Sequence, residues 1–310
     1  MKLSISVTNY SWDDTDDLAS HLGTIASTAD GVGVDTLWVA DHLVQADPSA
    51  SLGEPMLEAY TTLGFLAART ERLNLGTMVT WVGIRPATLL IKAITTLDVL
   101  SRGRAWLGVG AGYRDDEAKM MGLPFAPTRE RFEFVEDTLE LAKQMWSGDE
   151  SAFHGSQIEV ARPISVPRPI SRSGPRILIG GTGEKRTLPL VARHADACNL
   201  FDIPDQGKTI RHKLEVLDKA CRQIGRDPSE IETTVSARLA TSEKVSNLAD
   251  RCRAFADWGI DHVVLITDGA WTVEKVETVG AAVDEVAGLP DAIGAETLAR
   301  GCARPKRQSI

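Results

Sequence analysis

Residues 176–199 read RILIGGTGEKRTLPLVARHADACN, and this stretch decides the fold that the sequence predicts. Its first four residues are mostly aliphatic and predict a short buried strand, which the following glycines end at once. Apolar residues then recur at helical spacing at Leu188, Val191 and Ala192, and residues 196–200 return to strand character. The stretch therefore predicts a strand, a glycine turn, a helix and a second strand.

The glycine turn is suited to hold an anion. It consists of Gly180, Gly181, Thr182 and Gly183. Where a strand turns into a helix, unpaired backbone N–H groups point toward one spot and the helix dipole adds partial positive charge. Lys185 and Arg186 add charge in the expected first helical turn, where the dipole alone would not favour them. Two interpretations stay open: a phosphate site, or an ordinary connection that uses glycines for turning.

The rest of the chain repeats this alternation of strand and helix. Expected strands lie at residues 3–8, 34–39, 73–80, 103–110, 176–179, 196–200, 231–238 and 260–266. Eight such strands predict a single (β/α)8 barrel over residues 1–290, with an open doubly wound sheet as the alternative. A segment rich in proline and arginine at about 149–175 predicts an insertion before the fifth strand, with a hairpin near residues 153–160. Residues 291–310 are expected to form a basic polar C-terminal tail.

Composition and charge limit the class of partner. The 310 residues are 43% hydrophobic and carry a net charge of −9 without a long basic block. Nucleic acid is not expected as the main partner, because phosphate-backbone binding needs clustered Lys and Arg. With neither a signal peptide nor an apolar run of membrane-spanning length, we expect a soluble cytoplasmic protein that binds a small molecule. The cysteines lack metal-ligand or redox-pair spacing and are expected to be mostly buried thiols: Cys198, Cys221, Cys252 and Cys302.

In a (β/α)8 barrel, the loops that follow the strands line the active site. The segments expected to meet at this mouth are Asp41-His42, Thr80-Trp81, residues 110–113 and the glycine turn. The glycine turn follows the fifth expected strand, whereas barrel phosphate sites most often follow the seventh and eighth. Either the strand count or the usual placement therefore fails here.

Five segments resemble the bacterial-luciferase-like superfamily, and most closely its coenzyme F420-dependent oxidoreductases. They are LWVADH at 37–42, LGTMVT at 75–80, TLDVLSRGR at 96–104, LGVGAGY at 107–113 and IGGTGEKRTL at 179–188. They follow the family's order over most of the first two hundred residues, and after Phe201 the resemblance is only to a generic barrel half. The resemblance implies a homodimeric (β/α)8 barrel that holds a flavin or deazaflavin at the strand ends.

The resemblance also implies roles for single residues. The glycine turn would hold the cofactor phosphate, and Met78-Val79 would form a strand bulge with a non-prolyl cis peptide bond behind the tricyclic ring. Asp41 and Thr80 would meet the polar edge of that ring. The remaining residues implied in cofactor binding are Gly110 and Gly112, which would allow close approach to the backbone, and Tyr113.

His42 is the candidate catalytic residue. A histidine beside the ring can donate or accept a proton near neutral pH while hydride moves to or from the deazaflavin carbon. The alternative is a histidine that only fixes the loop or the cofactor by hydrogen bonding. Four aromatic residues next to strand ends form either an apolar substrate pocket or parts of the core or a lid: Tyr10, Trp12, Trp81 and Tyr113.

The expected function is that of an F420-dependent oxidoreductase acting on an unidentified small organic substrate, with an FMN-dependent luciferase-like monooxygenase as the alternative. Lys185 and Arg186 weakly favour F420, because its acidic tail would attract positive charge. The family's sugar-phosphate dehydrogenases resemble one another in a carboxylate directly after the glycine pair. Because this chain has Tyr113 there, with Glu117 following within a turn, glucose 6-phosphate oxidation is not expected. A catalytically silent cofactor-binding protein is a rival, and no metal site is expected because Asp41 and His42 lack a second ligand cluster.

Overall fold

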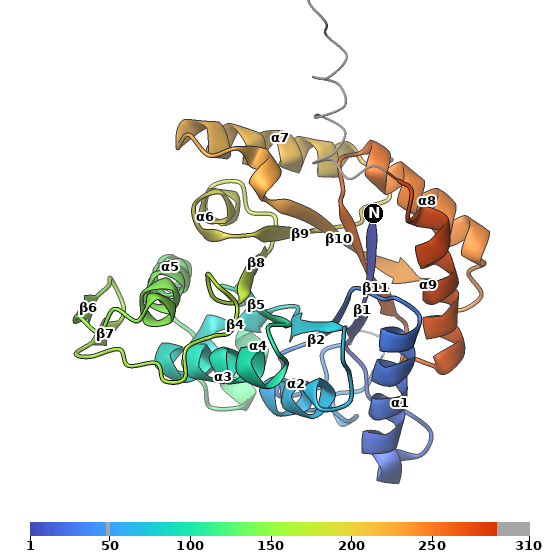
Figure 1. Ribbon diagram of the computed structural model, residues 1–310, viewed down its shortest axis with the longest axis horizontal. Helices are drawn as coiled ribbons and strands as arrows, with labels where there is room; N and C mark the ends of the chain where they lie inside the picture. The colour runs from blue at the N-terminus through green and yellow to red at the C-terminus, as the bar shows by residue number, and fades with distance from the viewer. Residues whose placement is uncertain (48–49, 290–310) are drawn as a thin grey trace, which may run out of the picture.

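The structure, a computed structural model, describes residues 1–47 and 50–289. A closed ring of eight parallel strands forms the centre of this part of the chain (Figure 1). In chain order the ring strands are β1 (Lys2–Val7), β2 (Thr36–Val39), β3 (Asn74–Thr77), β5 (Ala105–Gly110), β8 (Arg176–Gly180), β9 (Ala197–Phe201), β10 (Glu232–Leu239) and β11 (His262–Thr267). Each strand pairs with the next, and β11 pairs with β1. This closure confirms the predicted (β/α)8 barrel and excludes the open doubly wound sheet.

Each predicted strand is present, but the third is divided. The predicted strand at residues 73–80 becomes β3 and a separate β4 (Thr80–Trp81). Between them lie Met78 and Val79, joined by a cis peptide bond as the family resemblance implies. β4 lies outside the ring and pairs with β5 through Thr80 and Val109.

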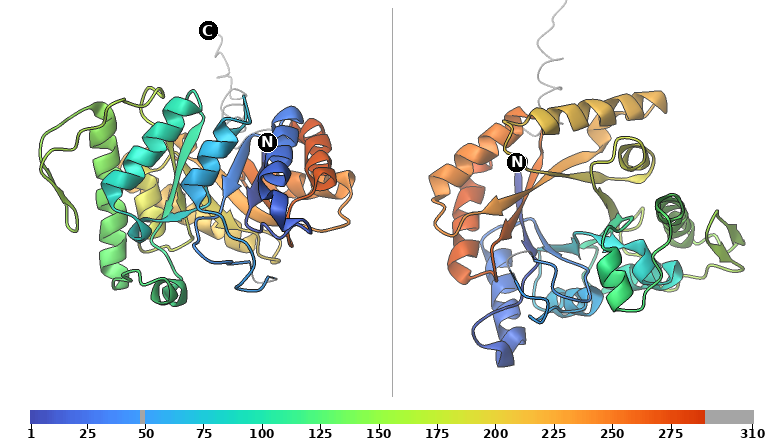
Figure 2. Two further views of the ribbon diagram at one scale, coloured as in Figure 1. Left: turned by 90° about the horizontal axis from the view of Figure 1, so that it is seen from below. Right: turned by 180° about the vertical axis from the view of Figure 1, so that it is seen from behind.

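The helices surround the strands, as two further views show (Figure 2). Their bounds are α1 (Leu18–Gly31), α2 (Ala59–Ala67), α3 (Ala87–Leu100), α4 (Asp115–Met120), α5 (Thr128–Ser147), α6 (Thr187–His194), α7 (Lys208–Gln223), α8 (Val245–Asp257) and α9 (Val273–Val286), with 3-10 turns at Thr15–Asp17, Val82–Ile84 and Pro228–Glu230. The sequence does not predict α4, because its residues DDEAKM carry no apolar stripe at helical spacing. Across the described residues, no helix combines the length and apolar character needed to cross a membrane.

The inside of the barrel is only partly apolar. An inner cluster fills its centre and consists of Trp38, Trp106, Leu178, Ala197 and Val264, with Met78 and Val79 packed against it. Because alternate residues of a barrel strand point to the same side, Glu232, Thr234 and Ser236 of β10 share one face. Asn199 of β9 hydrogen-bonds to both Thr234 and Ser236. The barrel therefore carries a polar strip on its β9–β10 side.

A buried ionic network lies at the amino-terminal end of the strands. Glu232 Oε1 lies 2.7 Å from His262 Nδ1, and Glu232 Oε2 accepts from Lys2 at 3.0 Å and from Arg176 at 2.9 Å. Burial alone would raise the pKa of the Glu232 carboxyl. The hydrogen bond from His262 and the charges of Lys2 and Arg176 outweigh that effect and hold this pKa below its ordinary value. Glu232 therefore stays ionised in the folded barrel at neutral pH.

The insertion at residues 149–175 forms the predicted hairpin from β6 (Phe153–His154) and β7 (Glu159–Val160), which pair antiparallel. Figure 1 shows this hairpin outside the ring, beside α5. Asp137 of α5 accepts hydrogen bonds from the backbone N–H groups of residues 156–158, which fixes the hairpin turn to the barrel. Cys198, Cys221 and Cys252 are buried and unpaired, as expected, whereas Cys302 and the predicted tail at 291–310 lie outside the described residues.

Candidate active site

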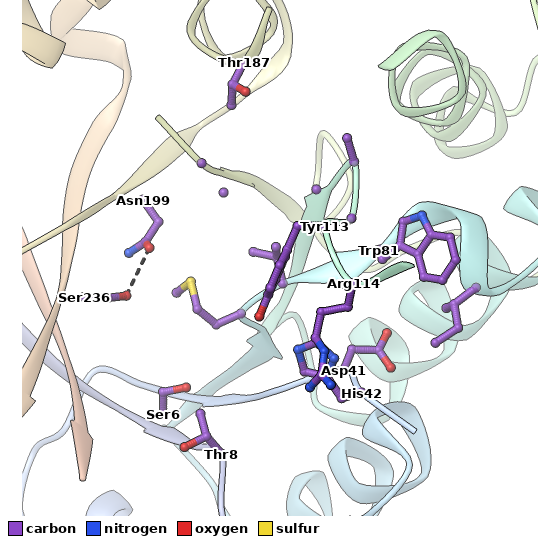
Figure 3. A pocket seen from close by; sticks show the side chains of 18 of the residues that line it. Ser6, Thr8, Asp41, His42, Trp81, Tyr113, Arg114, Thr187, Asn199 and Ser236 are labelled. Atoms are coloured by element: carbon purple, nitrogen blue, oxygen red, sulfur yellow. Dashed lines mark hydrogen bonds between the residues drawn. The ribbon is translucent and has the colours of Figure 1, made fainter. Parts of the chain in front are cut away.

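A cavity of about 540 Å³ opens at the carboxyl ends of the barrel strands (Figure 3). Gly181 and His42 both border it, so the glycine turn and the candidate catalytic histidine share one space. The sequence-predicted residues that line it are Asp41, His42, Met78, Val79, Trp81, Gly110, Gly112, Tyr113, Gly180 and Gly181. Three other predicted residues, Thr80, Thr182 and Gly183, are not among the lining residues. The loops predicted to converge therefore do so.

Val79 shapes the floor of the cavity. A Cβ atom placed on either Gly110 or Gly180 would lie 3.0 Å from the methyl groups of Val79. Side chains at those two positions would therefore be in tight contact with Val79, which would have to shift by a few tenths of an ångström to admit them. Gly110, which the resemblance implies in close approach of the ring, and Gly180 of the glycine turn thus both make room for a neighbouring side chain.

The helix that follows the glycine turn begins later than the sequence predicts. α6 starts at Thr187, so Lys185 and Arg186 precede the helix and do not lie in its first turn. The reason is Pro189: a helix starting at Lys185 would place this proline at the fifth helical position, where the missing N–H would break an intrahelical bond. Arg186 instead lies over the ring of Phe132, 5.6 Å from its centroid.

The turn still presents backbone donors beside the cavity. Gly181 has a φ of +112°, a conformation that favours glycine. Its N–H donates to Asn199 O at 3.4 Å, whereas the N–H groups of Thr182 and Gly183 find no acceptor among the described residues. Thr187, the first residue of α6, lines the cavity with its side chain. The strand end, turn and helix start thus form a concave polar corner of the kind that binds anions.

His42 is held by a carboxylate from a different loop. His42 Nδ1 lies 2.6 Å from Glu117 Oε2, and the N–H of Leu43 donates to Glu117 Oε1 at 2.6 Å. Because an ionised carboxylate only accepts hydrogen bonds, Nδ1 carries the shared proton. Nε2 has no hydrogen-bond partner among the described residues, and the side chain is 20% exposed at the cavity. The arrangement leaves Nε2 of His42 available to exchange a proton with a ligand.

Glu117 lies buried on α4, and both its burial and its partners affect the pKa of its carboxyl. Burial would raise the pKa of its carboxyl, but the hydrogen bonds from His42 and the Leu43 N–H, with the charges of His42 and Arg114, lower it below the ordinary value. The carboxylate is therefore ionised at neutral pH. Glu117 follows the glycine pair within a turn in the sequence, but its contact with His42 spans 75 residues and has no local signal.

Asp41 is occupied by partners of its own. Arg85 grips it with two hydrogen bonds, Nη1 to Oδ2 at 2.6 Å and Nη2 to Oδ1 at 2.9 Å. Thr80 Oγ1 donates to Asp41 Oδ2 at 2.7 Å, and Tyr60 OH lies 2.9 Å from Thr80 Oγ1. Arg85 also contacts Glu58. Asp41 and Thr80, predicted to meet a cofactor edge, thus form a buried network in which Thr80 lies behind Asp41.

The four candidate aromatic residues separate into two groups. Trp81 and Tyr113 line the cavity, and Tyr113 is 76% exposed at its mouth. Tyr10 and Trp12 do not line it: Tyr10 is fully buried in the main core, and Trp12 stacks on His21 and donates to the carbonyl oxygen of Trp271. The core alternative therefore holds for Tyr10 and Trp12.

Further lining residues have no sequence motif. Figure 3 shows Ser6, Asn199 and Ser236 on one side of the cavity, and Asp41, His42 and Arg114 on the other. The lining residues outside the segments predicted to form the site are Ser6, Thr8, Ile84, Arg114, Phe132, Thr187, Asn199, Phe201, Ser236 and Ile266. One available signal is the alternation of Ser4, Ser6 and Thr8 with aliphatic residues in the first strand, which marks a polar inward face.

One group of possible metal ligands occurs in the described part of the chain, on the outer helices. Glu136 and Glu140 of α5 and His194 at the end of α6 bring their ligand atoms within 4.8 Å of one another. Arg193 Nη2 already lies 2.8 Å from Glu136 Oε1, and none of the three residues lines the cavity. This group is therefore separate from the candidate active site.

The closed barrel with a cavity at the carboxyl ends of its strands places the molecule in the (β/α)8 class, in which enzyme sites form at that end. The chain belongs to the luciferase-like monooxygenase family, whose model matches residues 1–298.

Relatives of known name differ in what they act on. An F420-dependent glucose-6-phosphate dehydrogenase of Kineococcus radiotolerans is 29% identical over 241 residues, 76% of this chain and 68% of the relative. A phthiodiolone/phenolphthiodiolone dimycocerosates ketoreductase of a Mycobacterium species is 30% identical over 242 residues, 72% of this chain and 60% of the relative. Sequence similarity therefore does not select one substrate.

Solved structures with the same fold use two kinds of cofactor. An F420-dependent secondary alcohol dehydrogenase superposes with a TM-score of 0.78 at 15% identity, covering 92% of this chain and 98% of the other. The oxygenating constituent of 3,6-diketocamphane monooxygenase from Pseudomonas putida, solved with FMN, superposes with a TM-score of 0.71 at 13% identity, covering 96% and 98%. At these identities the similarity establishes the fold alone.

Proposed function

We propose that this chain is a coenzyme F420-dependent oxidoreductase that transfers a hydride between the deazaflavin and a small organic substrate. The observation that carries the proposal is the shared cavity, in which the anion-binding corner at Gly181 and the proton-exchanging Nε2 of His42 border one space. The names of the related F420-dependent dehydrogenases support the choice of coenzyme.

The residues present fit such a coenzyme in three respects. The N–H groups of Thr182 and Gly183, without acceptors among the described residues, and the side chain of Thr187 offer donors to a phosphate. The Met78–Val79 bulge and the glycines beside it give an apolar floor for a flat ring. Lys185, in the turn before α6, supplies positive charge for the acidic tail that distinguishes F420 from FMN.

The chemistry divides between the coenzyme and His42. When bound, F420 supplies a two-electron carrier that accepts or releases a hydride. In the oxidative direction, Nε2 of His42 would take the proton from the hydroxyl group of an alcohol substrate and pass it to water, while the coenzyme would supply the hydride acceptor. Glu117 keeps the proton on Nδ1 and so keeps Nε2 in its accepting form. In the reductive direction, the protonated imidazole of His42 would return the proton to the carbonyl oxygen of the substrate.

A titration of the coenzyme-free protein tests the choice of coenzyme. We expect F420 to bind at least about tenfold more tightly than FMN, a difference of about 1.4 kcal/mol, followed by fluorescence or calorimetry. Gly181→Val serves as the control, because a branched side chain at a φ of +112° distorts the turn and weakens binding of both coenzymes. Tighter binding of FMN would replace this proposal with the alternative, an FMN-dependent monooxygenase, which the FMN-containing neighbour supports.

A further inference from the structure

One wall of the cavity carries no ionisable side chain. Its residues come from β1, the position directly after β1, β9, β10 and β11: Ser6, Thr8, Asn199, Phe201, Ser236 and Ile266. The ionisable lining residues other than Tyr113 come from the segments after β2 and β5, namely Asp41, His42, Arg114 and Glu117. Charge is therefore confined to one side of the cavity, as Figure 3 shows for its labelled residues.

The charged side chains on the other side of the cavity are already paired with protein groups. Arg85 neutralises Asp41, and His42 is bound to Glu117. Arg114, the lining arginine, donates to Asp116 Oδ2 at 2.6 Å. Among the described residues that line the cavity, no lysine or arginine is thus left without an acidic partner. A substrate phosphate or carboxylate buried there would lack the compensating cation that a buried anion needs.

The cation of β10 nearest this wall in sequence is also engaged elsewhere. Arg238 lies two residues after Ser236, but its guanidinium forms an ion pair with Asp268 and does not line the cavity. Arg238 is therefore paired outside the cavity and gives this wall no free cation.

Ser6 supplies a buried hydroxyl without a partner in this wall. The polar groups of Asn199 and Ser236 already have protein partners, because Ser236 Oγ donates to Asn199 Oδ1 at 3.0 Å, and Asn199 Nδ2 donates to Thr234. Ser6 is 1% exposed, lines the cavity, and its hydroxyl has no hydrogen-bond partner among the described residues. A buried hydroxyl without a partner favours a ligand that offers one oxygen atom.

The mouth of the cavity carries exposed aromatic rings. Phe201 of the uncharged wall is 53% exposed, and Tyr113, whose ring packs edge-on against His42, is 76% exposed; both line the cavity. Ile203, two residues after Phe201, is 43% exposed. Exposed apolar side chains that continue into a cavity mark a surface for an apolar ligand. The exposed side chains at the mouth and the uncharged wall therefore both favour an apolar ligand.

We infer that the substrate is an uncharged, apolar ketone or secondary alcohol whose oxygen bonds to Ser6 and whose hydrocarbon part contacts Phe201 and the mouth. This inference rests on the proposed hydride transfer and names its substrate class. It also separates this chain from the relatives named as glucose-6-phosphate dehydrogenases, because a sugar phosphate finds no free cation on this wall.

A homologous series tests the inference by binding. Calorimetry on the F420-loaded protein compares 2-butanone, 2-hexanone and 2-octanone with glucose 6-phosphate. We expect affinity to rise about fourfold per methylene, and glucose 6-phosphate to bind about a hundredfold more weakly than 2-octanone. Flat affinities along the series, no ketone binding, or preferred binding of glucose 6-phosphate would overturn the inference.

Two variants locate the effect. Phe201→Ser is expected to lower 2-octanone affinity about tenfold while leaving F420 affinity within about twofold. Ile224→Ser is the matched control, since Ile224 is 51% exposed and does not line the cavity, and it should leave both affinities unchanged. Equal effects of the two substitutions would count against the assignment of Phe201.

The same series distinguishes failure of this inference from failure of the proposed function. If F420 does not bind, the coenzyme assignment fails, and the ketone series repeated on the coenzyme-free protein still reports on the wall. If F420 binds and glucose 6-phosphate is the preferred ligand, the proposed oxidoreductase stands and the substrate class is wrong.

Discussion

His42 is fixed at one ring nitrogen and open at the other. We expect His42→Asn to lower kcat by about 10²- to 10⁴-fold, because the substrate oxygen then lacks a proton acceptor of suitable basicity. F420 affinity should stay within about twofold, since the glycine corner is unchanged. Steady-state kinetics with a separate F420 titration measures both. Unchanged turnover would assign His42 a purely structural role and favour a catalytically silent site.

Glu117 acts through His42 and is a positioning residue. We expect Glu117→Gln to lower kcat about tenfold with little change in KM, because Gln keeps one oxygen acceptor but loses the charge that holds the proton on Nδ1. The check is the kcat and KM split, with unfolding in urea to confirm that stability is retained. A change confined to KM would mean that Glu117 shapes substrate binding instead.

At the scale of elements, the Arg85–Asp41 pair joins β2 to the loop before α3. Their side chains are 14% and 0% exposed, so Arg85→Met leaves a buried carboxylate unpaired and should cost about 3 to 5 kcal/mol. The double variant Asp41→Asn with Arg85→Met should cost less than the sum of the single variants, which a urea-unfolding cycle measures. Arg222→Met is the control: Arg222 is 75% exposed, and its pair with Asp218 is worth less than about 1 kcal/mol. Additive effects would show that the pair is not coupled.

The elements could be predicted from the sequence where local pattern decides them. The strand before Gly180 and the stripe at Leu188 and Val191 follow from side-chain periodicity, and the barrel follows from their repetition. The start of α6 could have been predicted from Pro189. By contrast, α4 has no apolar stripe, because its burial rests on Glu117 and Ala118 at the cavity edge.

The site could be predicted only in part, for a physical reason. His42 and the glycine turn stand in recognisable local sequence, but the contacts that define their state are long-range. Arg85 lies 44 residues from Asp41, and Ser236 lies 37 residues from Asn199. No local sequence pattern encodes contacts between residues so far apart in the chain, since closure of the ring brings them together.

At the scale of the whole molecule, the ionic network at the amino-terminal end of the barrel links stability to pH. The pKa of Glu232 is lowered in the folded state, so its stabilising contribution is complete above the ordinary value of 4.5 and is lost as pH falls below it. We expect Glu232→Gln to lower the free energy of unfolding by about 3 to 5 kcal/mol at pH 7, and the difference from wild type to shrink below about pH 4.5.

Urea unfolding at pH 7 and pH 3.5 measures this difference. Glu230→Gln is the matched control, because Glu230 is 61% exposed and its ion pair with Arg226 should contribute little at either pH. A destabilisation by Glu232→Gln that does not change with pH would show that packing, and not charge, is what the substitution removes.

Most of the uncharged wall follows the redox residues along the chain. His42, Glu117 and the glycine corner all precede α6, whereas Asn199, Phe201, Ser236 and Ile266 follow it, with Ser6 and Thr8 as the exceptions. A crossover between α6 and β9 would therefore exchange the part of the wall that includes Phe201 while keeping the proton-handling residues and the Ser6 hydroxyl together. Preference for the hydrocarbon part of a substrate can thus change in β9, β10 and β11 without altering His42 or Glu117.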